Sequence, residues 1–419
     1  MTMSTPRILG SRKMQVFSVL AVLLSLALLA SACGGDGEEN PFHVKSEVVT
    51  VAERPFALTF APDGRLFYGE QFTGNIRVIT PDGELQKEPF AHVDATSFLA
   101  WGLTGLALDP DFEANGYVYA LYTEAAKSPT SGPFVKNPVG KPMLVRFTDE
   151  NNKGVDQKII VGDLPDTNPE WPGINGNGSL HFGPDGFLYF TLGDYNWAST
   201  IGPGGKPYSL DFQTPIGKML RIDKDGEAPP DNPFVGDPLA DPRIFARGFL
   251  KAFDFVFHPE SGQLYGTDGT TSCEELDLIT AGGNYGWPEV GDFPWPDCFA
   301  GEQIDAIHLF SIESKKPGDF LSTVSVSGME FVSGDQYPLL GDSLLVCESG
   351  TKLMRRLILS GAKLDQVAEV AENEEVDNNV VIEDCQMDIA VSPEGIVYYS
   401  NEKEIRRLVQ QELEKTPES

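Results

Sequence analysis

Few side chains in this sequence occur in patterns that are typical of catalysis. There is no G-x-S-x-G nucleophile elbow and no H-E-x-x-H zinc motif, and the Gly-Lys pair at 205–206 is followed by proline, which excludes a phosphate-binding loop. His181 has the chemistry of a base, but it lies in an alternating apolar segment, which favours a structural role. Arg243, Arg247 and Lys251 could bind an acidic ligand, although ion pairs with the chain's 62 acidic residues are the simpler interpretation.

Cysteine is the other residue type with reactive chemistry. Five are present, and one of them, Cys33, belongs to the leader described below. The remaining four predict two disulfides in an oxidising compartment. Spacing favours Cys273–Cys298 and Cys347–Cys385, although three pairings are possible. A zinc site is the weaker alternative, because no C-x-x-C pair occurs and the five histidines are scattered.

The first 32 residues have the form of a secretory signal peptide. A basic stretch precedes an uncharged run at 16–30, which is shorter than the roughly 20 apolar residues of a membrane span. LASAC at 29–33 looks like a bacterial lipobox, so we expect lipidation of Cys33 and extracytoplasmic attachment to the bacterial cell membrane. Residues 33–42 then form a flexible, Gly-rich, acidic tether. An ordinary signal peptide or an uncleaved anchor is the alternative.

The composition is strongly acidic, with 62 Asp and Glu against 31 Lys and Arg and a formal net charge of −31. The leader contains three of the basic residues and no acidic one, so the exported chain is more acidic still. Such a surface repels phosphate, and we therefore expect no nucleic-acid partner.

One short phrase recurs through the chain: an apolar residue, proline, an acidic residue and glycine, followed by apolar and aromatic residues. Clear copies occur at 60–67 (FAPDGRLF), 108–119, 182–189 (FGPDGFLY), 257–265 and 391–399, with a weaker copy at 331–346. Proline and glycine form a tight turn, and the alternation that follows predicts a strand. Each copy therefore predicts one β-hairpin.

Six such units without an amphipathic helix between them predict an all-β fold, a six-bladed β-propeller with mainly four-stranded antiparallel blades. A β-sandwich would not explain the repeat. We expect this single domain at residues 43–410, followed by a polar tail at 411–419. Loops rich in Gly, Pro, Asp and Asn, such as 165–179 and 229–242, are expected to carry any binding chemistry.

Longer segments, taken in order, resemble the soluble glucose/sorbosone dehydrogenases, a family of six-bladed propellers that bind pyrroloquinoline quinone (PQQ) and calcium. The matching segments are PDGRLFYGEQFTGNIRVI at 62–79, GLTGLALDPDFEANGYVYALYT at 102–123, LHFGPDGFLYFTLGD at 180–194, IGKMLRIDKDG at 216–226 with DNPF at 231–234, and EELDLITAGGNYGWP at 274–288. IGKMLRIDKDG and GGNYGWP are the most distinctive. The resemblance implies a sugar-oxidising site with PQQ on one face of the propeller.

The resemblance also implies a histidine base, which removes the proton of the sugar's anomeric hydroxyl while a hydride passes to the quinone. In the family this base begins an H-x-G-G-R-L segment, which corresponds to NGNGSL at 175–180. Asn175 stands at the position of the base and cannot accept a proton at a useful pH. Ser179 stands at the position of the arginine.

The other positions that contact PQQ in the family are also changed. A glutamine, arginines, an asparagine and a lysine are replaced at Ala100, Leu250, Lys251, Gly350, Cys385 and Met387, with Lys352 two residues from Gly350. Charge-assisted hydrogen bonds contribute about 1.5–3 kcal/mol each. The loss of several of them around a tricarboxylate predicts that PQQ does not bind.

The family's calcium loop is better preserved. Its D-E-L-N segment corresponds to EELD at 274–277, and Tyr285 of the N-Y-G-W-P segment is retained. Calcium prefers several oxygen ligands in flexible geometry, so the Glu275 carboxylate and the Tyr285 carbonyl are its candidate ligands. The equal alternative is that these acids only form turns.

These observations support two hypotheses about function. The first is an exported, lipid-anchored propeller that has lost catalysis and binds a sugar, a polymer or a protein at the cell surface. The second is a divergent sugar or aldose oxidoreductase with a remodelled quinone site. A fold alone does not decide between them, and the changed residues favour the first.

Overall fold

The computed structural model describes residues 40–125, 139–167, 175–195, 201–269, 274–288, 303–310, 324–368 and 379–411. The signal peptide, Cys33, the pair Cys273–Cys298 and the tail beyond residue 411 lie outside these ranges, so the expectations for them stay predictions. No helix within the described ranges is long and apolar enough to cross a membrane.

The unit that begins at Pro41 consists of six four-stranded antiparallel sheets, each of which is one blade. Blades 1 to 3 contain β2 (Pro55–Phe60), β3 (Leu66–Glu70), β4 (Asn75–Ile79) and β5 (Ala91–His92); β6 (Leu103–Leu108), β7 (Tyr117–Ala125), β8 (Val139–Asp149) and β9 (Gly154–Val161); and β10 (Asn177–Phe182), β11 (Leu188–Leu192), β12 (Lys218–Ile222) and β13 (Ile244–Arg247). Blades 4 to 6 contain β14 (Phe255–Phe257), β15 (Leu264–Gly269), β16 (Glu274–Ile279) and β17 (His308–Phe310); β18 (Val326–Val332), β19 (Ser343–Glu348), β20 (Leu353–Leu357) and β23 (Val380–Glu383); and β24 (Ile389–Val391), β25 (Val397–Ser400), β26 (Glu404–Gln410) and β1 (Val44–Val51).

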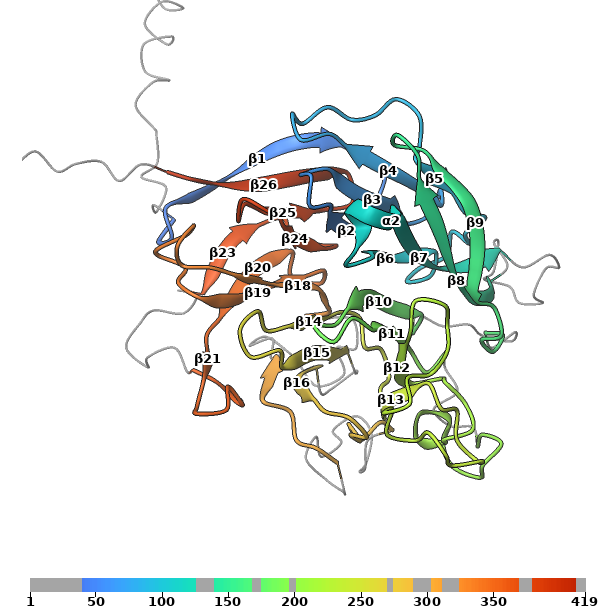
Figure 1. Ribbon diagram of the computed structural model, residues 1–419. Coiled ribbons are helices and arrows are strands. Elements are labelled where there is room, and N and C mark those ends of the chain that lie inside the picture. The colour runs from blue at the N-terminus through green and yellow to red at the C-terminus, as the bar shows by residue number, and fades with distance from the viewer. Residues whose placement is uncertain are drawn as a thin grey trace, which may run out of the picture. The chain divides into compact units, whose positions relative to one another are not determined.

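The blades surround a common axis, and the first strand of each recurring hairpin lies nearest the centre (Figure 1). The ring closes through β1, which pairs antiparallel with β26 and forms the outer strand of blade 6. In the described residues, helical structure is limited to α2 (Phe112–Asn115) and a 3-10 turn at Tyr208–Leu210, and β21 (Leu359–Ser360) pairs with β22 (Gln366–Val367) in a small separate hairpin. The prediction of an all-β, six-bladed propeller is confirmed.

Each recurring turn phrase joins the first and second strands of one blade. The six copies connect β2 to β3, β6 to β7, β10 to β11, β14 to β15, β18 to β19 and β24 to β25. Gly64 and Gly186 in two of these turns have φ angles of 85° and 78°, which glycine adopts without steric strain. The turn chemistry therefore fixes the innermost hairpin of every blade.

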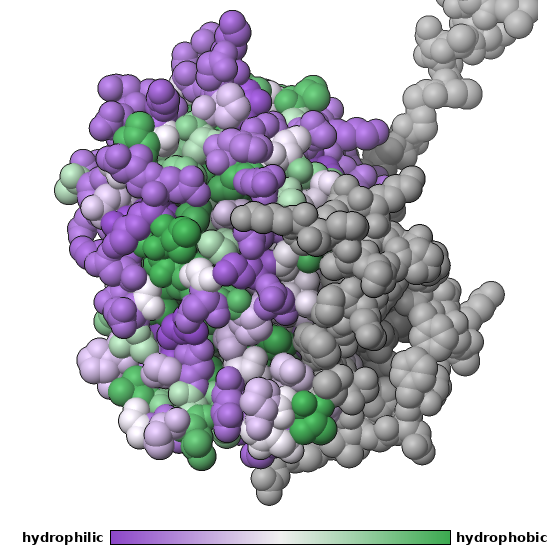
Figure 2. Space-filling model, turned by 90° about the vertical axis from the view of Figure 1, so that its right-hand side faces the viewer, coloured by the Kyte–Doolittle hydropathy of each residue, from purple (hydrophilic) through white to green (hydrophobic). Residues whose placement is uncertain are grey.

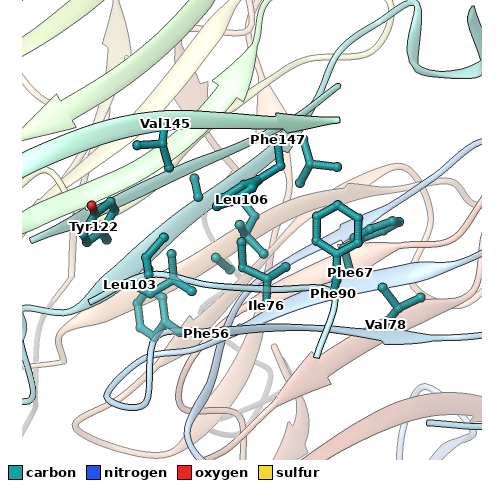
Figure 3. Packing of buried hydrophobic residues seen from close by; sticks show 14 of the residues in the cluster. Phe56, Phe67, Ile76, Val78, Phe90, Leu103, Leu106, Tyr122, Val145 and Phe147 are labelled. Carbon is teal, nitrogen blue, oxygen red and sulfur yellow. The ribbon is translucent and has the colours of Figure 1, made fainter. Parts of the chain in front are cut away.

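Apolar side chains fill the spaces between neighbouring blades. Figure 3 shows the cluster between blades 1 and 2, where Phe56, Phe67, Ile76, Val78 and Phe90 from blade 1 face Leu103, Leu106, Tyr122, Val145 and Phe147 from blade 2. Burial of a large apolar side chain contributes about 1.5–3 kcal/mol. Five further clusters lie at the other boundaries between blades. Because apolar side chains occupy the spaces between the blades, polar groups are placed at the ends of the innermost strands.

Candidate functional site

The residues that correspond to the family's active site lie at one end of the propeller, which we call the entrance face. It is the end where the innermost strands begin and the second strands finish. Hydrogen bonds join blades there: Thr191 Oγ1 donates to the Ala252 carbonyl at 2.6 Å, and Ser400 Oγ donates to the Pro55 carbonyl at 2.8 Å. The positions singled out in the sequence lie just before an innermost strand or just after a second strand: Ala100, Asn175, Leu250, Lys251, Gly350, Cys385 and Met387.

The position of the expected base holds a hydrogen-bonded amide. Asn175 is buried, and its Nδ2 donates to Asp194 Oδ1 at 2.8 Å. Asp194 is fully buried and also accepts the indole N–H of Trp287 at 3.0 Å, while the Trp287 side chain remains partly accessible. The trio therefore presents the Trp287 ring, fixed from behind by a buried carboxylate, and the amide at position 175 is not a base.

Ser179 and His181 lie in β10, where His181 pairs with Tyr189 of β11. Ser179 Oγ lies 2.7 Å from His181 Nε2, and the same nitrogen lies 3.0 Å from Asp254 Oδ1. The imidazole is therefore fixed between two blades, in agreement with the structural role expected for it. Ser179 provides a hydroxyl where the family pattern has a guanidinium.

The turn that contains Leu250 and Lys251 is held by a buried carboxylate. Asp268 accepts the backbone N–H of Leu250 at 2.9 Å and that of Lys251 at 2.6 Å. The Leu250 side chain is buried, and the Lys251 ammonium lies 3.8 Å from the centroid of the Phe253 ring. Burial lowers the pKa of Lys251 to about 8, although the charges of Glu274 and Asp268 partly oppose this effect. Lys251 therefore holds its proton less tightly than an exposed lysine does.

The basic cluster noted in the sequence is divided among separate contacts. Arg243 pairs with Asp163 and Asp241, each at 2.7 Å, which confirms the ion-pair interpretation for this residue. Arg247 donates to the carbonyl of Gly282 at 3.0 Å. These arginines do not converge on one ligand.

Cys385 and Met387 are taken up in apolar packing. A disulfide joins Cys347 of β19 to Cys385, with Cα atoms 5.1 Å apart, and both cysteines are buried in the core between blades 5 and 6. This is one of the two pairings favoured by the spacing. Met387 is buried in the cluster between blades 1 and 2. Neither side chain can offer a cation to a ligand.

Ala100 and Gly350 contribute no polar side chain, and their neighbours do not replace one directly. The amide of Gln71, on the adjoining blade, donates to the Trp101 carbonyl at 3.1 Å. Lys352 is exposed and has a φ angle of 67°, a conformation that favours glycine. Lys352 is the nearest lysine in the sequence to Gly350, where the family pattern has one, but it stands two residues later.

The candidate calcium ligands lie where blades 3 and 4 meet. Glu275 in β16 is opposite Asp268, and the Tyr285 ring stacks on Phe249. Asp277 is fully buried, and neither of its carboxylate oxygens has a hydrogen-bond partner in the described residues. Burial and the charge of Asp268 raise the pKa of Asp277 well above its usual range. A cation could supply the missing partner, although no three acidic, His or Cys side chains in the described ranges are arranged to hold a metal.

Several polar residues of the entrance face do not belong to any recognised motif. Asp194 and Trp287 lie inside segments that match the family, but the sequence does not show that they meet. Asp254 and Asp388 each stand five residues before the proline of a turn phrase, in DFVFHP and DIAVSP. Alignment of the repeats was the available signal for these two aspartates.

Comparison with known proteins supports the same assignment. Residues 52–410 match the family model described as glucose/sorbosone dehydrogenase. The chain is 27% identical over 305 residues to quinoprotein glucose dehydrogenase B of Acinetobacter calcoaceticus, a match that covers 69% of this chain and 60% of that protein. It is 24% identical over 388 residues to aldose sugar dehydrogenase YliI of Escherichia coli (strain K12), covering 91% and 94% of the two chains.

A solved structure agrees with these sequence matches. A putative oxidoreductase (glucose dehydrogenase) of Thermus thermophilus is 25% identical, with a TM-score of 0.68 over 87% of this chain and 100% of that chain. The chain therefore belongs to the glucose/sorbosone dehydrogenase family.

Proposed function

We propose that this chain is an exported lipoprotein whose propeller binds a saccharide at the entrance face without oxidising it through PQQ. The observation that carries the proposal is the trio of Asn175, Asp194 and Trp287. An amide that donates to a buried carboxylate stands where the family places a base, so proton removal lacks a contribution usually worth about 10²–10⁴-fold. Binding groups remain, but the group needed for oxidation does not.

The residues at the expected PQQ contacts do not fit that cofactor. Leu250 is buried, Cys385 is joined to Cys347, and Met387 packs in an apolar core. A tricarboxylate placed beside these residues would lose water and gain few hydrogen bonds, which is unfavourable. Lys251 and Lys352 are the nearest cations among these positions, and they are too few to balance three carboxylates.

A saccharide is the ligand class that suits the trio best. The Trp287 ring offers a flat, partly accessible apolar surface, and the buried Asp194 fixes its orientation by accepting the indole N–H. An aromatic ring held in this way matches the apolar face of a sugar ring. The named relatives act on glucose or aldose sugars, which is consistent with a sugar as the ancestral ligand.

The first test measures chemistry and binding separately. Dye-linked oxidation of glucose and other aldoses, with added PQQ and calcium, should show no saturable turnover, and equilibrium dialysis should show no submicromolar PQQ binding. A glycan array followed by calorimetry should identify a saccharide whose binding is lost in Trp287→Ala. The matched control is Phe60→Ala, a partly buried aromatic at the opposite end of β2.

The second candidate function is an aldose oxidoreductase with a remodelled site. Lys251 favours it, because an amine with a pKa of about 8 on the entrance face is able to exchange protons near neutral pH. Saturable aldose turnover in the first assay, lost in Lys251→Met, would establish this alternative. Turnover that survives that change would reject both this role for Lys251 and the non-catalytic proposal.

The proposed location rests on the lipobox-like segment at 29–33. Replacement of Cys33 by serine should block lipid attachment and move the protein from the membrane fraction to the soluble fraction. Normal processing with unchanged membrane retention would contradict a lipid anchor at Cys33.

A further inference from the structure

Four ionisable side chains from four blades come together among the innermost strands. His181 lies in β10, Asp254 precedes β14, Glu330 lies in β18 and Asp388 precedes β24. The closest contact is that of His181 Nε2 with Asp254 Oδ1, at 3.0 Å. Each of the four is near enough to affect the protonation of at least one other member. We call them the axial cluster.

Two members of the axial cluster hold neighbouring blades together. Asp254 Oδ2 accepts the backbone N–H of Met329 at 2.7 Å, which links blade 4 to blade 5. Asp388 Oδ2 accepts the backbone N–H of Leu58 at 2.6 Å, which links blade 6 to blade 1, where the ring closes. Both donating amides follow an irregularity in their strand, after Val326 and Phe56, respectively. The carboxylates therefore satisfy amides that the local pairing leaves free.

The cluster lacks enough positive charge to balance three ionised carboxylates. Within the part of the chain that the structure describes, His181 forms an ion pair with Asp254, and no Lys or Arg forms one with any member of the cluster. Burial raises the pKa of Glu330 to about 7. Burial, followed by the charge of Asp254, raises the pKa of Asp388 well above its usual range. Protons bound to these carboxyl groups therefore reduce the negative charge of the cluster, since no Lys or Arg side chain in the described residues does so.

The imidazole responds to the same charges. Burial opposes protonation of His181, but its hydrogen bond to Asp254 and the charges of Asp254, Glu330 and Asp388 outweigh this and raise its pKa. Because several elements contribute to this balance, a change at one member affects the others.

We propose that the axial cluster is a proton-linked latch that holds blade 4 to blade 5 and blade 6 to blade 1. Loss of its protons places like charges close together in a buried site, and this repulsion loosens both boundaries although each ionised carboxylate accepts its amide more strongly. The latch is connected to the entrance face by the chain itself. Asp254 directly follows the turn that contains Leu250 and Lys251, and Asp388 directly follows Cys385–Met387. Deprotonation would therefore mobilise two of the segments that form the candidate site.

The direction of the pH effect follows from linkage. The raised pKa of His181 gives stability that is present below the unfolded value of about 6.5 and is lost as pH rises through the folded value. Glu330, raised from 4.5 to about 7, holds a proton that the unfolded chain releases, so its contribution declines as pH rises from about 4.5 to 7. Asp388 acts in the same direction from 3.8 upward. All three groups predict a tighter latch in mild acid.

Hydrogen exchange and titration of the full chain test the latch without any ligand. At pH 8, after correction for intrinsic exchange, peptides covering 55–60 and 326–332 should exchange faster than at pH 5.5, by about tenfold for each pKa unit of linkage. NMR of the wild-type chain should give His181 a pKa above the ordinary value, assigned with His181→Asn. In Glu330→Gln this pKa should fall and the pH dependence of exchange should weaken.

The control is Glu260→Gln, an exposed carboxylate outside the cluster, which should change neither measurement. If Glu330→Gln fails to fold, Asp388→Asn and the wild-type titration provide the same comparison. A His181 that titrates at its ordinary pKa, or exchange at 55–60 and 326–332 that does not differ between pH 5.5 and 8, would overturn the latch. These outcomes do not depend on whether a saccharide binds at the entrance face.

Discussion

One position in the repeat has different roles in different blades. It lies five residues before the turn proline and is occupied by Ala57, Gly105, Ser179, Asp254 and Asp388 in the five clear copies. The two aspartates each accept a backbone N–H from the next blade, whereas Ser179 contacts His181. Alignment of the repeats therefore identifies equivalent positions in the blades. The residue type at such a position determines whether it forms a hydrogen bond to the next blade.

Asn175→His should not restore sugar oxidation. The new imidazole would supply a base, but Leu250, Cys385 and Met387 would still offer no cation to the cofactor. Dye-linked aldose oxidation should stay at background with PQQ and calcium, and PQQ binding should remain undetectable in the submicromolar range. Saturable turnover in this single variant would show that cofactor binding had survived and that the base alone was missing.

Calcium should raise the melting temperature of the wild-type chain. Ligand binding to the folded state at 100 times its Kd stabilises by about 2.7 kcal/mol. Glu275 provides one carboxylate, and Asp277, which is protonated without the metal, becomes a second one when calcium displaces its proton. Glu275→Ala should remove this increase, while Glu260→Ala should keep it. A wild-type melting curve unchanged by calcium and by chelator would eliminate the metal.

Part of the site could be predicted from the sequence. Asn175, Leu250 and Met387 were located because they interrupt segments that otherwise match the family. The contact of Asp194 with both Asn175 and Trp287 could not be predicted, because Trp287 stands 93 positions after Asp194 and reaches it from the loop between β16 and β17 of the neighbouring blade. The calcium positions stay a prediction, since spacing does not show whether their oxygens converge.

At the scale of the element, two hairpins repeat a pattern that the turn phrases do not contain. E-x-x-T-x-x-x-R occurs at 70–77 between β3 and β4 and at 348–355 between β19 and β20. In both hairpins the glutamate accepts a hydrogen bond from the threonine and pairs with the arginine. The residue after threonine has a positive φ angle in both, 72° at Gly74 and 67° at Lys352.

Lys352→Gly should stabilise the fold by about 0.5–1 kcal/mol. The left-handed conformation costs a non-glycine residue about 1–2 kcal/mol, partly offset by the greater flexibility of unfolded glycine. Gly74→Ala is the comparison and should destabilise strongly, because its Cβ would lie 2.0 Å from the Val93 carbonyl oxygen. Urea denaturation of both variants checks these signs; a destabilised Lys352→Gly would mean that the lysine makes contacts worth more than its strain.

The innermost hairpins were the most predictable elements, and the outer strands were the least. Pro-acid-Gly turns mark β2–β3 and β10–β11 directly in the sequence. By contrast, β5 has two residues and β17 has three, which is too short for an alternating pattern to be recognised. Such strands form because the neighbouring strand offers an edge for pairing, so their position depends on tertiary structure and not on the local sequence.

At the scale of the whole molecule, the contacts that close the ring oppose the repulsion within an acidic surface. Hydrophilic side chains dominate the face shown in Figure 2, where hydrophobic ones form small separate patches. A formal net charge of −31 favours solubility but opposes compaction by self-repulsion. The contacts that join the first and last blades must therefore resist this repulsion.

The contribution of the closing strand can be measured by truncation. Val44 and Phe42 are buried in the core between blades 5 and 6, and Ser46 Oγ contacts both Tyr399 Oη, at 2.5 Å, and Arg406 Nε, at 2.7 Å. A chain that begins at residue 40 should unfold in urea at the same midpoint as a chain that begins at residue 34, because it keeps all of these contacts. A chain that begins at residue 52 should lose several kcal/mol of unfolding free energy, since each large apolar side chain removed from the core accounts for about 1.5–3 kcal/mol and the edge of β26 becomes unpaired.

A synthetic peptide of residues 40–51 added to the shorter chain should pair with β26 and raise its midpoint in a concentration-dependent way, whereas the same peptide with Val44→Asp should not. Equal stability of the two truncated chains would show that β1 is not needed to close the ring, and that the contact of Asp388 with Leu58 is sufficient.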